Sequence, residues 1–205
     1  MISKSDREDC IERYDKAFEK YGKSHKALLW GGDAEKQVKR FKSISEHIVT
    51  NPNINSVLDV GCGFADLYNY LISVGFNGSY TGIDLNNQFI KVAKSLYPTG
   101  SFICGSLDEL KTNKTYDAVI SCGIFNYNLR KQSNLKYIEN SLIKIFSLCN
   151  CLSSSDFLTS IVDWKNANSF HLDPLDLIKM VTPITNKFQL NHHYLEYEYS
   201  VTLFK

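Results

Sequence analysis

The sequence carries almost no excess charge of either sign. Its 205 residues include 23 Lys and Arg against 22 Asp and Glu, which gives a net charge of +1. A chain of this kind has no long-range attraction for a polyanion or an anionic membrane, so nucleic acid is not an expected partner. No stretch approaches the roughly 20 apolar residues that cross a bilayer, and the first residues, MISKSDREDC, are charged. The expected location is therefore the cytoplasm.

Paired metal-ligand spacings are also missing. The six cysteines show no C-x-x-C pair, which is the spacing typical of structural zinc sites. Most of them lie in apolar runs, so we expect reduced, buried thiols and no metal. No internal repeat is visible. The length and the 43% of hydrophobic residues predict a single domain over residues 1–205, with a helical lid at 1–50 and a core at 56–205.

The hydrophobic pattern predicts an α/β fold. Apolar residues recur every three or four positions in 6–21 and 33–49, which predicts two amphipathic N-terminal helices. Strands and helices then alternate, as is typical of a Rossmann-like, doubly wound and mostly parallel sheet. Two β-rich runs at 187–194 and 197–205 predict an antiparallel hairpin that brings the sheet to seven strands. The other strands are expected at 57–60, 80–84, 101–104, 116–121 and 157–162, and the later helices at 66–74, 88–96, 134–148 and 175–181.

Two glycines and two carboxylates surround the end of the first expected strand, in the segment SVLDVGCGFADL at 56–67. Gly61 and Gly63 let a ligand approach the backbone, although a lone G-x-G is equally typical of a tight turn. Asp66 stands where a dinucleotide fingerprint has its third glycine, and a carboxylate at a helix N-terminus would repel a phosphate. Asp59 adds a second negative charge. The segment therefore favours a ligand with positive charge, such as an ammonium or a sulfonium.

A further acid defines the rest of this ligand. Asp84 ends the second expected strand, 21 residues after Gly63, where a carboxylate can accept hydrogen bonds from both hydroxyls of a ribose. A ribose joined to a cationic amino acid describes S-adenosylmethionine. At this point the sequence resembles the class I S-adenosylmethionine-dependent methyltransferases. VLDVGCGFADL looks like their first motif, TGIDL like their second and YDAVISCGIFNY like their fourth, over residues 56–127.

The resemblance implies roles for the matching positions. Asp59 and the two glycines would line the methionine portion, Asp84 would hold the ribose, and Leu85 would pack on the adenine. Ser106 replaces the acid that often meets the adenine amine, so Ser106, the backbone of Leu107 or Asp108 could make that contact. The predicted cofactor-binding set is Trp30, Arg40, Asp59, Gly61, Cys62, Gly63, Asp66, Asp84, Leu85, Ser106, Leu107, Cys122, Gly123 and Phe125.

Methyl transfer is an in-line displacement that needs an aligned acceptor and, for some acceptors, a base. The loop after the fourth strand, GIFNY, has neither the Asn/Asp-Pro-Pro-Tyr/Phe motif nor the Pro-Cys pair of nucleobase methyltransferases. Histidine can accept a proton near neutral pH, and adjacent strand residues face opposite sides, so only one of His192 and His193 can face the pocket. The candidate catalytic residues are Asn126, Asp163, His192, His193 and Tyr194. For each, a structural role is the alternative.

One N-terminal helix is expected to close the site. Gln37 and Arg40 are three residues apart and share a helix face. With Trp30 this helix would form a lid in which Arg40 pairs with the methionine carboxylate. The alternative is an arginine that is solvated at the surface.

The overall order of these features is similar to small bacterial methyltransferases of metabolite and cell-surface polysaccharide pathways, including some suggested to methylate phosphoramidate capsule groups. The expected function is methylation of a small polar acceptor at oxygen, with S-adenosylmethionine as the donor. Two alternatives stay open, an RNA or protein methyltransferase and a non-catalytic cofactor-binding partner subunit. The acceptor and the oligomeric state are not predicted.

Overall fold

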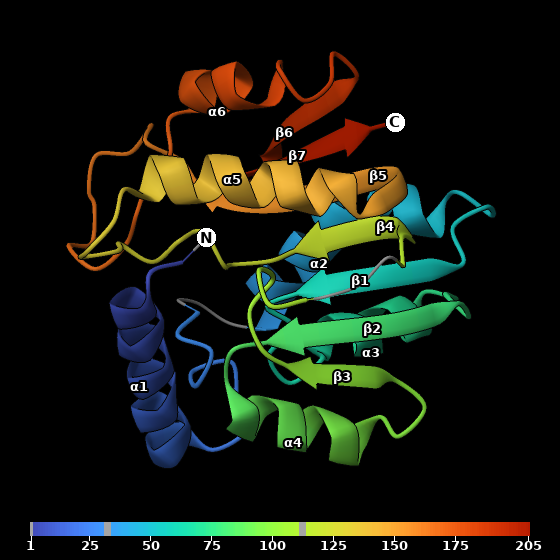
Figure 1. The fold of residues 1–205 in the computed structure, drawn as a ribbon, viewed down its shortest axis with the longest axis horizontal. Coiled ribbons are helices and arrows are strands. Elements are labelled where there is room, and N and C mark those ends of the chain that lie inside the picture. Colours follow the sequence, from blue (N-terminus) through green and yellow to red (C-terminus); the bar gives the residue numbers. More distant parts are fainter. Residues whose placement is uncertain (1, 31–33, 111–113) are drawn as a thin grey trace.

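A seven-stranded sheet forms the centre of the protein, with the strand order β3-β2-β1-β4-β5-β7-β6 (Figure 1). The computed structural model describes residues 2–30, 34–110 and 114–205. Neighbours among the first five strands are parallel, and β7 runs antiparallel to both β5 and β6. The predicted mostly parallel sheet with an antiparallel C-terminal hairpin is confirmed. The strands are β1 Ser56–Val60, β2 Ser79–Asp84, β3 Ser101–Cys104, β4 Tyr116–Ser121, β5 Cys149–Leu158, β6 Phe188–Leu195 and β7 Glu198–Phe204.

Helices cover both faces of the sheet. Along β1, Val57 packs with the core formed by α2, α3 and α4, while the next residue, Leu58, packs with α5 and α6. This alternation follows from the two-residue period of a strand that is buried on both sides. The helices are α1 Lys4–Tyr21, α2 Ala34–Val49, α3 Asp66–Ser73, α4 Asn87–Leu96, α5 Asn134–Ser147 and α6 Pro174–Val181. The helices expected after the first strand all lie within two residues of their predicted bounds.

The fifth strand differs from its prediction. We expected it at 157–162, but β5 spans Cys149–Leu158, and residues 161–163 are coil in which Ile161 and Asp163 are exposed. The hydroxyls of Ser153, Ser154 and Ser155 hide this strand in the sequence because they read as polar. In the fold these residues are buried, and neighbouring strands supply hydroxyl partners, Ser121 for Ser155 and Thr202 for Ser154.

The two N-terminal helices have different places. α1 crosses the ends of the parallel strands, on the left in Figure 1. α2 lies against the sheet at β5, β6 and β7, with Phe41, Ile44 and Ile48 buried in the core. The helix of Gln37 and Arg40 was expected to form a lid, and it packs instead as one layer of the core, from which Gln37 and Phe41 reach the cleft at the strand ends. It is α1 that covers the strand ends.

Two segments lie outside the described residues. They are 31–33, which include the expected start of α2 at Asp33, and 111–113, in the polar stretch before β4 where no helix was expected. Leu28, in the loop between α1 and α2, is buried against Phe64 and Phe89. Within the described ranges, no helix combines the length and the apolarity needed to span a membrane.

Candidate active site

A cleft opens at the carboxyl ends of β1, β2, β3 and β4, under α1. It brings together most of the residues that the sequence suggested for the cofactor: Trp30, Asp59, Gly61, Cys62, Gly63, Asp66, Asp84, Leu85, Ser106, Leu107, Cys122 and Gly123. Cys10 and Tyr14 of α1 also line it, although sequence reasoning did not assign them to the site. The signal for them was present, because Tyr14 lies on the apolar face of the predicted helix. Because α1 places this apolar face over the strand ends, the face lines the cleft beneath it.

The glycine loop has the conformation that its sequence requires. Gly61 and Gly63 have φ angles of 79° and 53°, a region that side chains with a Cβ rarely adopt. A Cβ on Gly61 would lie 2.2 Å from Cγ2 of Ile124, so the loop after β1 meets the loop after β4 at contact distance. α3 begins at Asp66, and Ala65 before it provides no side-chain cap. The Lys23 ammonium lies 3.9 Å from the Asp66 carboxylate and partly balances its charge, and the Gln37 amide donates a hydrogen bond to the same carboxylate at 3.4 Å.

Asp84 is fixed by the backbone on either side of it. The Gly63 N–H donates to one carboxylate oxygen at 2.9 Å, and the Asn86 N–H donates to the other at 2.8 Å. Burial raises the pKa of Asp84, and these two hydrogen bonds oppose that rise. Asn86 also caps α4 by accepting from the N–H groups of Gln88 and Phe89. The carboxylate is thus held at the lip of the cleft, with lone pairs still free for a ligand hydroxyl.

Asp59 has a buried carboxyl that the protein satisfies only in part. The Tyr80 hydroxyl donates to one of its oxygens, and the other oxygen has no partner among the described residues. Burial raises the pKa of Asp59 to about 7; the Tyr80 hydrogen bond opposes this, and the charge of Asp84 adds to it. An orphaned carboxyl oxygen beside a cleft is a site for a donor that arrives with the ligand. An ammonium group fits it well.

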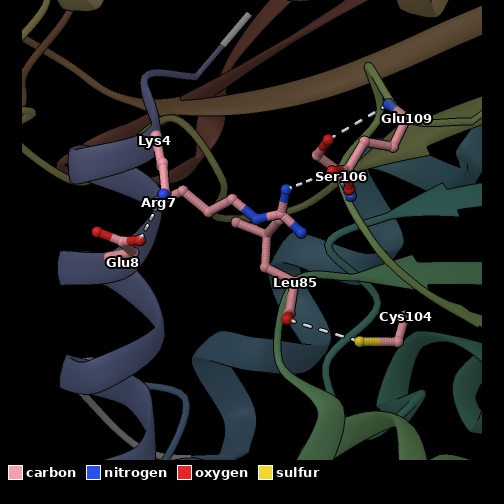
Figure 2. A network of polar contacts seen from close by, with 7 residues as sticks. All are labelled: Lys4, Arg7, Glu8, Leu85, Cys104, Ser106 and Glu109. Carbon is pink, nitrogen blue, oxygen red and sulfur yellow. Dashed lines mark hydrogen bonds and ion pairs between the residues drawn. The ribbon is translucent and has the colours of Figure 1, made fainter.

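The loop after β3 forms a turn that two internal hydrogen bonds stabilise. The Ser106 N–H donates to the Glu109 carboxylate at 3.0 Å, and the Glu109 N–H donates to the Ser106 hydroxyl at 3.3 Å. From α1, Arg7 reaches the other oxygen of Glu109 at 2.6 Å (Figure 2). The hydrogen bond from Arg7 is the main reason that the pKa of Glu109 falls to about 2. Leu85 and Leu107 line the cleft beside this network and provide apolar surface for an adenine ring.

Some residues of the loop after β4 line the cleft, and others are buried in the core. Cys122 and Gly123 line the cleft. Phe125 was expected at the cofactor, but it is buried in the core and stacks on Phe157 with ring centroids 5.2 Å apart. Asn126 was a candidate for catalysis, but its side-chain oxygen accepts the Leu158 N–H at 3.0 Å. These two side chains hold the loop to β5 and do not line the cleft.

A cluster of buried charged side chains lies outside the cleft, next to Gly123. Arg40 forms a two-pronged ion pair with Glu198 of β7 through Nε and Nη2. Asp156 of β5 accepts the Gly123 N–H at 2.6 Å. Burial and the charge of Glu198 raise the pKa of Asp156 to about 6, against the opposing effects of Gly123, Arg40 and Cys122. The partner expected for Arg40 was the methionine carboxylate, and in the structure this place is taken by Glu198.

The remaining catalytic candidates do not line the cleft. Asp163 and His193 are exposed. His192 lies beside Tyr199 on the side of the sheet that α5 and α6 cover. The buried Tyr194 hydroxyl has no partner among the described residues, and burial together with the charges of Asp156 and Glu198 raises its pKa. Asp156 and Glu198 were missed because an acid within a serine run and an acid at a turn carry no sequence signal.

Comparison with known proteins identifies the cleft-bearing part of the chain. Residues 57–142 match the family described as "Methyltransferase domain". Over these residues the chain carries a methyltransferase domain. Within the part that the structure describes, no three His, Cys, Asp or Glu residues are grouped as a metal site.

Individual relatives of this methyltransferase domain share limited identity with it. A protein of Invertebrate iridescent virus 6 named as a methyltransferase is 33% identical over 87 residues, which are 42% of this chain and 33% of that protein. The chain thus spans about a third of the viral protein's length. The ubiquinone biosynthesis O-methyltransferase of Rickettsia canadensis is 29% identical over 163 residues, 70% of this chain and 68% of that one. Magnesium protoporphyrin IX methyltransferase of Synechocystis PCC 6803, solved with S-adenosylmethionine, shares the fold with a TM-score of 0.72, 14% identity, and coverage of 100% of this chain and 99% of that one.

Proposed function

We propose that this protein transfers a methyl group from S-adenosylmethionine to an oxygen of a small polar acceptor. The observation that carries the proposal is the pair of acids in the cleft. The Asp84 carboxylate is fixed at the lip by two backbone N–H groups, and the buried Asp59 carboxyl keeps one oxygen without a partner. The first suits a ribose diol and the second an ammonium group. Both acids lie within residues 57–142, which match the methyltransferase domain.

The chain's own residues would bind the cofactor and align the reacting groups. S-adenosylmethionine supplies, when bound, a methyl group on a positively charged sulfur. Asp84 orients the sugar, Leu85 and Leu107 exclude water around the base, and Asp59 holds the amino group. Gly61 and Gly123 let the two loops approach the reacting centre closely, because neither has a Cβ. Alignment of this kind accounts for much of the rate in a displacement that needs no metal.

Oxygen as the acceptor atom is supported by the Rickettsia canadensis relative, whose name states that it is an O-methyltransferase. A small acceptor is supported by the near-neutral net charge of +1 and by α1, whose residues Cys10 and Tyr14 line the cleft. Cytoplasmic location and a single domain over residues 1–205 stay predictions.

The test has two steps. Calorimetry should show binding of S-adenosylhomocysteine and no binding of NAD or ATP, since the acids of the cleft repel phosphate. Incubation with methyl-labelled S-adenosylmethionine should then label low-molecular-mass material from a cell extract. Labelling of RNA or protein instead would favour the macromolecular alternative. Tight binding with no label in any fraction would favour the non-catalytic partner subunit.

A further inference from the structure

A second recess lies outside the donor cleft and shares a wall with it. It has a volume of about 410 Å³. α1 contributes Asp9, Glu12, Arg13 and Lys16, and the loops after β4 and β5 contribute Tyr127, Arg130 and Asn168. We call it the outer recess. Tyr127 lines both the outer recess and the donor cleft. A molecule seated in the outer recess is therefore separated from the donor site by one side chain.

The wall between the two spaces is fixed from several sides. The Asn134 side chain donates to the Tyr127 carbonyl at 2.7 Å. The Asn128 N–H donates to the Asn168 carbonyl at 3.1 Å, and the Phe170 N–H donates to the Asn126 carbonyl at 3.0 Å. These bonds tie the loop after β5 onto the loop after β4. The outer recess is thus a built feature of the fold, because each of its two loops is held by the other.

The charges in the outer recess favour an anion. Lys16 and Glu12 form an ion pair one helical turn apart and cancel. The Arg13 guanidinium lies 4.9 Å from the centre of the Tyr127 ring, and within the described residues neither it nor the Arg130 guanidinium has a carboxylate partner. Two cations therefore face a single unpaired carboxylate, that of Asp9. Guanidinium groups bind carboxylate and phosphate oxygens through paired hydrogen bonds.

We propose that the outer recess binds the methyl acceptor, and that this acceptor is a small anion whose carboxylate or phosphate is held by Arg13 and Arg130. The inference rests on the proposed methyl transfer and adds its substrate class. With the anionic group anchored there, a hydroxyl of the acceptor reaches past Tyr127 toward the donor cleft. Its oxygen forms a bond to the methyl carbon as the carbon–sulfur bond breaks. The bonding electron pair stays on sulfur, which becomes a neutral thioether, and the hydroxyl proton passes to water.

The experiment uses the full chain, methyl-labelled S-adenosylmethionine and a cell extract of small metabolites separated on an anion-exchange column. Label is expected in retained, anionic fractions. Arg13→Gln and Arg130→Gln should each slow labelling by about tenfold, the value of one charge-assisted contact. Affinity for S-adenosylhomocysteine should stay within about twofold of the unaltered chain in both variants, because neither arginine lines the donor cleft. Lys136→Gln, on the exposed surface of α5, is the matched control and should leave the rate unchanged.

The possible outcomes separate this inference from the function on which it rests. Label in neutral or cationic fractions, or undiminished labelling by both arginine variants, overturns the anionic acceptor and leaves methyl transfer standing. Absence of label in every fraction despite S-adenosylhomocysteine binding overturns methyl transfer itself, and the inference with it. Pretreatment of the extract with alkaline phosphatase distinguishes the two anions. It abolishes labelling if the anchored group is a phosphate monoester and leaves it intact if the group is a carboxylate.

Discussion

At the scale of single residues, the Asp59 carboxyl couples cofactor binding to pH. Its pKa lies at about 7, mainly because it is buried. An ammonium ion pairs only with the ionised form, so below pH 7 binding must first remove a proton. Affinity for S-adenosylhomocysteine should therefore rise by about tenfold between pH 6 and pH 7.5. Asp59→Asn should bind more weakly and with little change over this range, as measured by calorimetry.

Adenosine provides the control for this prediction, because it carries the ribose and the base but no ammonium group. Its affinity should vary little between pH 6 and pH 7.5 in both the unaltered chain and Asp59→Asn. An equal pH dependence for adenosine and S-adenosylhomocysteine would place the titrating group elsewhere, with Asp84 as the first candidate because it is the proposed partner of the ribose that both ligands carry.

Breaking the Arg40–Glu198 ion pair should lower stability and leave binding unchanged. Both side chains are buried, so removing Arg40 alone leaves Glu198 and Asp156 as neighbouring charges without compensation. Arg40→Met should lower the free energy of unfolding by about 3–5 kcal/mol, measured by urea denaturation. The double variant Arg40→Met/Glu198→Leu should recover most of this loss, because no unpaired charge remains at that pair.

The binding measurement decides what Arg40 does. If the Arg40→Met/Glu198→Leu variant folds and binds S-adenosylhomocysteine with unchanged affinity, the arginine has a structural role. A large loss of affinity in the stable double variant would restore the prediction that Arg40 meets the methionine carboxylate.

Residues of the donor site could be predicted where one local motif fixes both position and chemistry. Gly61, Gly63 and Asp84 belong to strand ends whose spacing is set by a single β-α-β unit, so their meeting follows from the sequence alone. Arg40 and Glu198 could not be paired in this way. They are 158 positions apart, and their contact depends on where β7 enters the sheet.

At the scale of elements, α1 is fastened over the cleft at three places. The Asp6 carboxylate accepts the N–H groups of Arg130 and Lys131 after β4, Arg7 pairs with Glu109 after β3, and Asp15 accepts from the side chains of Asn86 and Gln88 after β2. Because α1 also lines the cleft, we expect a ligand to leave when some of these contacts open. Arg7→Ala and Asp15→Ala should therefore each speed the release of S-adenosylhomocysteine by about three- to tenfold, as measured by stopped-flow fluorescence of Trp30, which lines the cleft.

Lys4→Ala is the control for these variants. Lys4 lies on the same helix, and among the described residues its one ion-pair partner is Glu8, at 3.9 Å and with both side chains exposed. It should leave the release rate unchanged. If all three variants release the ligand at the rate of the unaltered chain, α1 does not govern exit from the cleft.

Elements were predictable where hydrophobic period and burial agree. β1 and β4 are apolar runs that are buried on both faces, so their bounds were predicted to within one residue. β5 was missed over most of its length because its buried positions are serines that exchange hydrogen bonds with β4 and β7. The role of α2 was also misread, because a helix with one apolar face fits a lid and a core layer equally well, and only the position of β5, β6 and β7 decides between them.

At the scale of the whole molecule, the sheet joins all the parts into one core. The apolar clusters on its two faces share the strands β1 and β4, and the smaller cluster under α1 contains Phe64 from the glycine loop and Phe89 from α4. Loss of packing on one face would expose β1 and β4, on which the packing of the other face also depends. Scanning calorimetry should therefore show one transition with equal calorimetric and van't Hoff enthalpies. S-adenosylhomocysteine at 100 times its dissociation constant should add about 2.7 kcal/mol to the stability and move this single peak upward as a whole. Two transitions, of which only one moves with the ligand, would show that the N-terminal helices or the C-terminal hairpin unfold as a separate unit.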